Sequence, residues 1–153
     1  MSNALTSDSL TEVLTALVAE YVSYSEGMNF EAKRALWDQD DTAPLLCPEE
    51  APEPLIGWPA INAYWSKSRE VMASLKSQTA NVRARLIALD IALVTYDMRW
   101  IATLSGAASR KPIAADVRVT ALLRKKPEGW RYFHLMEGPV DLLTMARLAA
   151  TPG

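Results

Sequence analysis

Apolar residues recur at intervals of three and four near the start of the chain, the pattern of a helix with one buried face. They are Leu10, Val13, Leu14, Leu17, Val18, Tyr21 and Val22. Polar residues 7–9 offer N-caps and Gly27 offers a C-terminal stop, so a first helix is predicted between them. A short second helix is predicted at 30–37. A third is predicted after Gly57, because Pro59 would fall in its first turn, where a missing N–H costs little.

The second half of the chain alternates apolar and polar residues, which is typical of strands. Four long strands are predicted at 78–89, 91–104, 113–126 and 130–139. Four prolines within 38–56 exclude helix and central strand there, so this stretch is predicted to be a loop with short edge strands near 45–47 and 53–56. A closing helix is predicted at 141–150. A chain with its helices first and its antiparallel strands later is typical of an α+β fold. A curved sheet covered by helices would enclose a cavity for a ligand.

Length and composition favour one domain spanning 1–153, with its core at about 7–139. The chain has 153 residues and 50% hydrophobic content, enough for a single core. Charged residues make up 22% and the net charge is −2, so no basic excess points to nucleic acid. The polar N-terminus resembles no export signal, and no apolar run reaches the length of a membrane span. A cytoplasmic protein is therefore predicted.

The chain contains one cysteine, Cys47, and one histidine, His134. A single cysteine excludes a disulfide within the chain, and the two residues together cannot supply the four ligands of a structural zinc site. The acidic residues also lack the spacing of a calcium loop. We therefore expect neither a metal nor a cofactor.

Several short motifs, in their order along the chain, resemble the SnoaL-like branch of the nuclear transport factor 2-like superfamily. They are the helix-loop-helix segments 36–43 (LWDQDDTA) and 56–65 (IGWPAINAYW), the strand 117–120 (VRVT), the turn 129–131 (GWR), and His134. The resemblance covers about residues 14–139 and implies a cone-shaped α+β barrel of cystatin-like form: a curved, largely antiparallel sheet packed on three N-terminal helices. It also implies a buried pocket and frequent dimerisation. Because members include enzymes, transport adaptors and assembly modules, function has to be argued from the site.

Tyr21 falls where the resemblance to ketosteroid isomerases places a catalytic tyrosine. That mechanism also needs a carboxylate base and a neutral acid. The position of the base falls near 46–48, which contains no carboxylate, and the position of the acid falls within 117–121, out of register with Asp116. We therefore do not predict this mechanism, and Tyr21 is a donor or a core tyrosine.

Glu137 and His134 are the candidate bases on the last strand. By resemblance to SnoaL-type cyclases, a catalytic aspartate would stand near Leu135, and Glu137 lies two residues on, on the same face. A solvent-exposed carboxylate at the strand end is the alternative. Alternation puts His134 on the opposite face with Trp130, Tyr132 and Met136. His134 is thus predicted at the outer surface or a dimer contact, with a place in the pocket as the alternative.

Asp97 and Arg99 interrupt the most apolar strand, where charges are costly unless they are paired or bind a ligand. The association domain of calmodulin-dependent kinase, by resemblance, has a pocket arginine near the position of Arg99, and a guanidinium suits a carboxylate. The alternative is an ion pair between neighbouring strands, Asp97 with Arg99 or Asp116 with Arg118.

Aromatic side chains are expected to supply the cavity wall, namely Trp37, Trp58, Tyr64, Trp65 and Trp100. Trp37 and Trp58 flank the proline-rich loop and would close over a flat ligand, with Tyr64 beside them on the third helix. The alternative is that these side chains simply pack the helix layer.

These observations lead to one main hypothesis and two alternatives. The main hypothesis is a homodimeric protein that binds a small anionic or polar-aromatic molecule in a buried pocket. One alternative is a cofactor-free isomerase, cyclase or hydratase (lyase) that uses Glu137 or His134 as base and Tyr21 as donor. The other is an oligomeric assembly module without catalysis.

Overall fold

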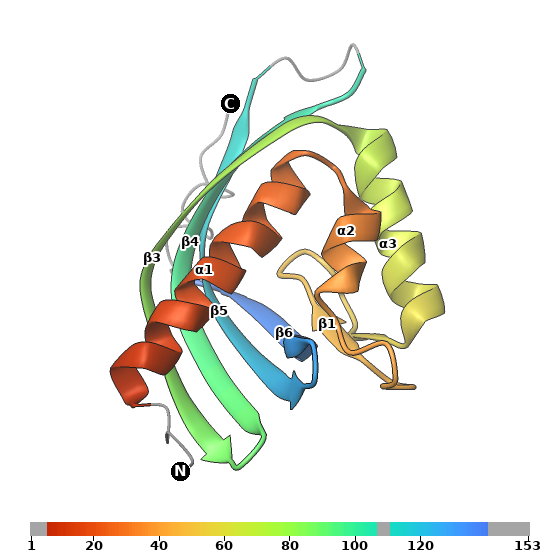
Figure 1. Ribbon diagram of the computed structural model, residues 1–153. Helices are drawn as coiled ribbons and strands as arrows, with labels where there is room; N and C mark the ends of the chain where they lie inside the picture. Colours follow the sequence, from red (N-terminus) through yellow and green to blue (C-terminus); the bar gives the residue numbers. More distant parts are fainter. Residues whose placement is uncertain (1–5, 107–110, 141–153) are drawn as a thin grey trace.

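The computed structural model describes residues 6–106 and 111–140, which form three helices and one sheet (Figure 1). The predicted helix at 141–150 lies outside the described residues. In chain order the elements are α1 (Ser7–Glu26), α2 (Phe30–Ala35), β1 (Leu45–Cys47), β2 (Leu55–Ile56), α3 (Trp58–Val71), β3 (Met72–Ala88), β4 (Ile91–Leu104), β5 (Ile113–Lys126) and β6 (Gly129–Pro139).

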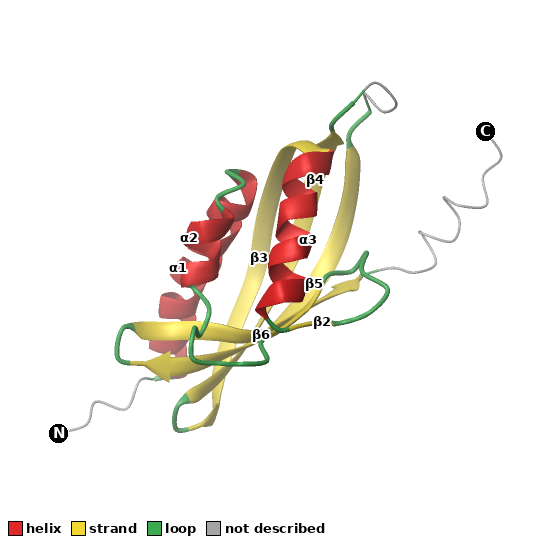
Figure 2. Ribbon diagram, turned by 90° about the vertical axis from the view of Figure 1, so that its right-hand side faces the viewer, coloured by secondary structure: helices red, strands yellow, loops and turns green. Residues whose placement is uncertain are grey.

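The strands form one curved, unclosed, mixed sheet in the order β2-β1-β6-β5-β4-β3. Every neighbouring pair is antiparallel except β1 and β6, which are parallel. All three helices lie on the concave side of this sheet, so the predicted α+β architecture is confirmed (Figures 1 and 2). None of the helices in the described part of the chain is long and apolar enough to cross a membrane.

The proline-rich segment departs from the prediction in one respect. The strand near 45–47 was predicted at the edge of the sheet, but β1 pairs with both β2 and β6. Leu46 is only 3% exposed, so burial of its side chain favours an interior position for this strand. The edge is formed by β2, which is two residues long.

A β-bulge in β6 changes which residues face the helices. Leu122 of β5 pairs with His134 and Leu123 pairs with Tyr132, so Phe133 is an extra residue without a partner. As a result Tyr132 (0% exposed) faces inward, as Leu135 (1%) does. Strict alternation put Tyr132 on the face of His134, and that prediction was wrong because the bulge inserts one residue between them.

Helix α1 packs its predicted apolar face against the sheet. Thr6 provides the cap that was expected within 7–9: its Oγ1 accepts a hydrogen bond from the N–H of Ser9 at 3.2 Å. At the other end Gly27 has a φ of −79°, and Met28 takes the left-handed conformation with a φ of 53°. Val13, at the margin of the apolar stripe, is 47% exposed. The helix is therefore held against the sheet by the buried residues at the centre of its apolar face, such as Leu14 and Val18.

A buried aromatic group joins the helices to the sheet. Trp37 is fully buried, and its ring centroid lies 5.9 Å from Tyr132, 6.4 Å from Trp65 and 6.0 Å from Trp58. Rings at these distances in tilted and edge-on arrangements gain contact energy beyond area burial. This group closes the end of the core next to the proline-rich loop.

An ion-pair network fixes the segment that follows Trp37. The carboxylate of Asp38 is 1% exposed and pairs with the guanidinium of Arg124, and also with Nζ of Lys126 at 3.1 Å. Burial raises the pKa of Asp38, but hydrogen bonds from the two cations outweigh it and lower this pKa below its usual value. The network ties the loop after α2 to the end of β5.

Candidate functional site

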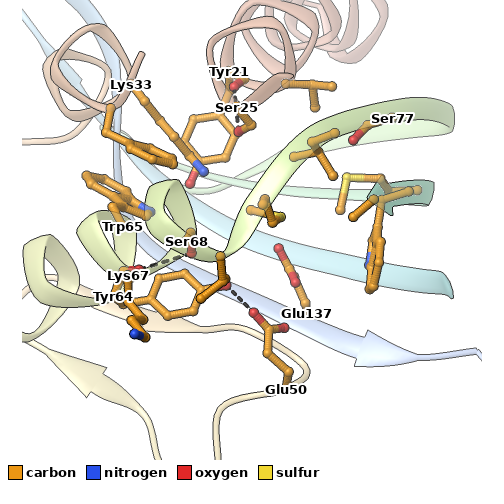
Figure 3. Close-up of a pocket in the computed structure, with 18 of the residues that line it drawn as sticks. Tyr21, Ser25, Lys33, Glu50, Tyr64, Trp65, Lys67, Ser68, Ser77 and Glu137 are labelled. Atoms are coloured by element: carbon orange, nitrogen blue, oxygen red, sulfur yellow. Dashed lines mark hydrogen bonds between the residues drawn. The ribbon is translucent and has the colours of Figure 1, made fainter. Parts of the chain in front are cut away.

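A cavity of about 400 Å³ lies between the three helices and the inner face of the sheet (Figure 3). Its walls are largely apolar and aromatic, including Trp65, Tyr96, Met98 and Trp100. A space of this volume, with apolar walls and few polar groups, suits a small organic molecule. The polar groups that line it are the side chains of Tyr21, Ser25, Lys33, Glu50, Tyr64, Lys67, Ser68, Ser77 and Glu137.

Glu137 is the acidic group on the inner wall. Strand pairing aligns it with Val119 of β5 and Tyr96 of β4, so the three side chains lie in one row across the sheet. Burial raises the pKa of the Glu137 carboxyl to about 7, and the charge of Glu50 adds to this. Lys33 and the N–H of Glu49 oppose the increase without cancelling it. Glu137 can therefore gain or lose a proton at neutral pH.

Lys33 reaches the same cavity from α2 (Figure 3). It stands three residues after the buried Phe30, which places both side chains on one face of the helix. Its Nζ lies 4.5 Å from the ring centroid of Tyr21 and 5.2 Å from that of Trp65. Burial lowers the pKa of Lys33 to about 8, although the charges of Glu137 and Glu50 act in the opposite direction.

Two hydrogen-bond donors near Lys33 are buried and unused. The hydroxyl of Tyr21 and the indole N–H of Trp65 find no hydrogen-bond partner among residues 6–106 and 111–140. Trp37 lies close to the Tyr21 hydroxyl but does not meet the geometry of a hydrogen bond. Burial raises the pKa of Tyr21 well above its usual value, so its hydroxyl stays protonated and can donate.

The loop after β1 covers another side of the cavity and contacts Glu137. The carboxylate of Glu49 accepts a hydrogen bond from Nε1 of Trp100 at 2.7 Å, and its backbone N–H lies close enough to Glu137 to lower the pKa of that carboxyl. The next residue, Glu50, accepts a hydrogen bond from the hydroxyl of Tyr64 on α3. These contacts hold the loop against β4, β6 and α3.

The structure brings three predicted site residues together and separates the others. Tyr21, Tyr64 and Glu137 line the cavity. His134, after the bulge, alternates with the inward-facing Leu135 and so lies on the outer face of the sheet, where partial burial lowers its pKa. His134 therefore does not face Glu137.

Asp97 and Arg99 lie on the outer, convex face of β4. Nη1 of Arg99 pairs with the Asp116 carboxylate of β5 at 3.0 Å, with both side chains more than half exposed. The carboxylate of Asp97 accepts a hydrogen bond from Asn81 at 2.7 Å. A cross-strand ion pair is therefore present, but between Arg99 and Asp116, because these two residues are directly opposite in the register.

Trp37 and Trp58 pack in the helix layer and do not line the cavity. Their rings meet edge-on, and the guanidinium of Arg34 lies 4.4 Å from the Trp58 ring centroid. This corresponds to the alternative in which the two tryptophans pack the helix layer. Trp65, Trp100 and Tyr64, which were also predicted to be wall residues, do line the cavity, together with Tyr21 and Tyr96.

Lys33, Glu49, Glu50 and Tyr96 were not selected from the sequence. Lys33 had a usable signal, the spacing of three from Phe30 on a short helix. Glu49 and Glu50 lie in a loop without periodicity, so nothing in the pattern indicates where they point. In the described part of the chain, no group of three or more His, Cys, Asp or Glu residues is arranged to hold a metal ion.

The comparison with protein families identifies this chain. The model of the SnoaL-like domain matches residues 14–137, which is most of the sequence. The chain therefore belongs to the SnoaL-like family, within the nuclear transport factor 2-like superfamily. A search of curated protein sequences finds no significant match.

Solved structures with the same fold include two proposed dehydratases. One, of the nuclear transport factor 2-like family from Streptomyces avermitilis, has a TM-score of 0.76 and 17% identity, covering 88% of this chain and 99% of that one. A proposed scytalone dehydratase from Novosphingobium aromaticivorans has a TM-score of 0.74 and 12% identity, covering 86% of both chains. A superfamily protein from Salmonella enterica serovar Typhimurium has a TM-score of 0.72 and 15% identity, covering 90% and 96%. At such identities the likeness establishes the fold alone.

Proposed function

We propose that the cavity binds a small, mostly apolar molecule and that Glu137 exchanges a proton with it, as in a cofactor-free isomerase or dehydratase. The observation that carries this proposal is the position of Glu137 on the apolar inner wall, with a pKa raised by burial to about 7. A group with its pKa near the working pH is the most effective general base or acid.

The other polar groups have roles that follow from their surroundings. The protonated Tyr21 hydroxyl can donate to an oxygen that gains negative charge as a neighbouring carbon loses its proton. The indole N–H of Trp65 is a second unused donor close to the same end of the cavity. The apolar walls bind the hydrocarbon part of the substrate and exclude water, which strengthens these polar interactions.

The comparisons support an enzyme of this class without identifying its substrate. Two of the similar structures are described as proposed dehydratases. A dehydratase removes water from its substrate, and a proton leaves carbon in this reaction. Within this chain, the outward position of His134 favours Glu137 as the base. A binding protein without catalysis is the second candidate, because the same cavity would hold a ligand.

Exchange of carbon-bound hydrogen with solvent can test the proposal before the substrate is known. Cyclohexanone and 2-cyclohexenone would be incubated with the protein in D₂O, and loss of the α-proton signals would be followed by NMR. We expect catalysed exchange that falls at least about 100-fold in Glu137→Gln and clearly, though less, in Tyr21→Phe.

The matched control is Glu128→Gln, an exposed glutamate in the turn between β5 and β6, which should exchange like the unaltered protein. Equal rates in Glu137→Gln and the unaltered protein would reject Glu137 as the base. If both ketones perturb Trp fluorescence without any exchange above buffer, the cavity binds but does not catalyse.

We also propose that the protein is a cytoplasmic homodimer that associates through the outer face of the sheet. Support comes from large apolar side chains exposed there, Ile101 on β4 and Met136 on β6, which are 42% and 50% exposed. His134 lies two residues before Met136 on the same strand. Large apolar side chains exposed on an otherwise polar sheet face can take part in a protein interface.

A further inference from the structure

We propose that Lys33 is a nucleophile that captures a small aldehyde or ketone in the cavity as an imine. This inference rests on the proposed function, because it uses the same cavity and gives its substrate a chemical class. The observation behind it is a lysine amine that faces an apolar cavity without a polar partner.

The position of the amine is unusual for a lysine. No hydrogen bond or ion pair joins Nζ of Lys33 to another described residue, and its near neighbours are the faces of Tyr21, Trp65 and Phe30, with the Phe30 centroid at 5.7 Å. Lysines are normally solvated or paired, and those held in apolar surroundings serve as nucleophiles because the neutral amine is favoured. Because its pKa is about 8, the side chain of Lys33 is a free amine in roughly a tenth of the molecules at pH 7.

The surroundings of Lys33 suit a carbonyl better than an anion. Glu50 and Glu137 line the same cavity and would repel a carboxylate or phosphate ligand. The hydroxyl of Tyr21 and the N–H of Trp65 are donors without acceptors, and both rings are in contact with Nζ. A carbonyl group offers what this end of the cavity lacks: an oxygen that accepts hydrogen bonds and a carbon that an amine can attack.

The reaction balances with water as its only by-product. The lone pair of Nζ attacks the carbonyl carbon as the carbon–oxygen π bond breaks; the oxygen takes up a proton from solvent and nitrogen gives one up to solvent, which gives a carbinolamine. The hydroxyl takes up a second proton and leaves as water, which forms a protonated imine, and loss of the remaining hydrogen of nitrogen as a proton gives the neutral imine. The net change is amine plus carbonyl to imine plus water, with no oxidation or reduction.

Imine formation would also make the proposed proton transfer easier. A protonated imine withdraws electrons from the neighbouring carbon more strongly than the parent carbonyl does, so an α-proton is lost more readily. Glu137, on the opposite wall of the cavity from α2, is the base available to remove it (Figure 3). Lys33 and Glu137 would then act in sequence on one substrate.

Reductive trapping tests the inference directly on the unaltered protein. Benzaldehyde and cyclohexanone would be added with cyanoborohydride at pH 7, and the modified lysines would be identified by peptide mass spectrometry. We expect Lys33 to be modified at least about tenfold faster than the exposed Lys125, because burial lowers the pKa of Lys33 and so increases its share of free amine at this pH. Modification of Lys33 should level off above pH 8.

The variants Lys33→Arg and Lys125→Arg complete the test. Loss of the fast adduct in Lys33→Arg only, with an unchanged melting temperature, supports the inference. Modification of Lys33 at the rate of Lys125 in the unaltered protein overturns it. The two proposals fail separately: Glu137-dependent exchange without a Lys33 adduct leaves the proposed function intact, and a Lys33 adduct without that exchange leaves this inference intact.

Discussion

Two carboxylates in this protein illustrate how surroundings decide the chemistry of a side chain. Asp38 and Glu137 are both removed from bulk solvent, and burial raises the pKa of each. Asp38 receives hydrogen bonds from Arg124 and Lys126, so its pKa ends below the usual value. For Glu137, burial and the charge of Glu50 outweigh the charge of Lys33 and the N–H of Glu49, so its pKa rises. The first carboxylate is therefore structural and the second is available for proton transfer.

Replacement of Glu137 should make stability less dependent on pH. The folded pKa of about 7 exceeds the unfolded value near 4.5, so the folded state binds more protons between these values and its stability falls as pH rises. Glu137→Gln removes this loss. The free energy of unfolding of the variant, relative to that of the unaltered protein, should increase by up to roughly 3 kcal/mol between pH 4.5 and 7. Above pH 7 this difference should stay constant.

Urea denaturation at several pH values measures this gain, with Glu128→Gln as the control. The groups that act on Glu137 (Glu50, Lys33 and Glu49) remain in the variant. A constant difference between the two proteins at pH 5 and pH 8 would show that Glu137 is ionised throughout.

Replacement of Asp38 should have the opposite signature. Asp38→Asn leaves Arg124 and Lys126 without their buried counter-ion, which we expect to cost about 3 kcal/mol at pH 7. The folded pKa is below the unfolded value near 3.8, so the contribution is present above that pH and is lost as pH falls below it. Asp40→Asn is the matched control, because Asp40 contacts Lys126 with its side chain 82% exposed. Equal urea midpoints for the two variants would contradict this prediction.

At the scale of elements, the bulge in β6 aligns the inner face of the sheet. One extra residue, Phe133, lets both Tyr132 and Leu135 point toward the helices although they are three positions apart. Without the bulge, one end of the strand would turn its apolar side chains to solvent. The bulge thus makes the buried aromatic group compatible with an inward-facing Glu137.

Deletion of Phe133 should therefore prevent cooperative folding. The deletion shifts the register by one residue, so either the pair Trp130 and Tyr132 or the pair Leu135 and Glu137 must reverse its orientation. Phe133→Ala keeps the register and removes a side chain that is not fully buried, including its contact with Arg124, 4.3 Å away, so it should be mild. Thermal unfolding monitored by near-ultraviolet circular dichroism distinguishes the two. A sharp, native-like transition in the deletion variant would contradict the argument.

For the whole molecule, the proposed ligand site and the proposed dimer interface lie on opposite faces of the curved sheet. The concave surface and the helices enclose the cavity, while the convex surface has paired charges such as Arg99 with Asp116 and exposed apolar side chains, Ile101 and Met136. A change on the convex face should alter oligomeric state without changing the cavity walls.

Substitution on the convex face should shift a dimer toward a monomer. We expect sedimentation equilibrium of the unaltered protein to give the dimer mass, and Met136→Glu combined with Ile101→Glu to give the monomer mass, because charges replace apolar contacts at the interface. Exposed Val13 on α1 lies away from the sheet face, so Val13→Glu should leave the mass unchanged. A monomer mass for the unaltered protein would exclude the proposed dimer.

Sequence patterns were sufficient to predict the helices, the long strands and the overall α+β architecture, but not the interior place of β1 or the bulge in β6. The spacing of Leu10, Leu14 and Val18 predicts α1, and the alternation through 113–126 predicts β5, because each pattern repeats with the period of the backbone that it lies on. Their order along the chain indicates a sheet that is covered on one face by helices. Tyr21 and Glu137 were also identified as site candidates, from the resemblance and from alternation near the strand end, and Tyr64 was identified as an aromatic residue of the third helix.

Sequence patterns could not predict which charged groups meet in the cavity. Lys33 lies on a six-residue helix and Glu50 in an aperiodic loop, so neither has a pattern long enough to define its direction. The position of Arg99 outside the cavity follows from the curvature of the sheet, which makes one face of each strand concave. Periodicity is local to one element, whereas proximity between α2, the loop after β1 and β6 exists only after the chain has folded.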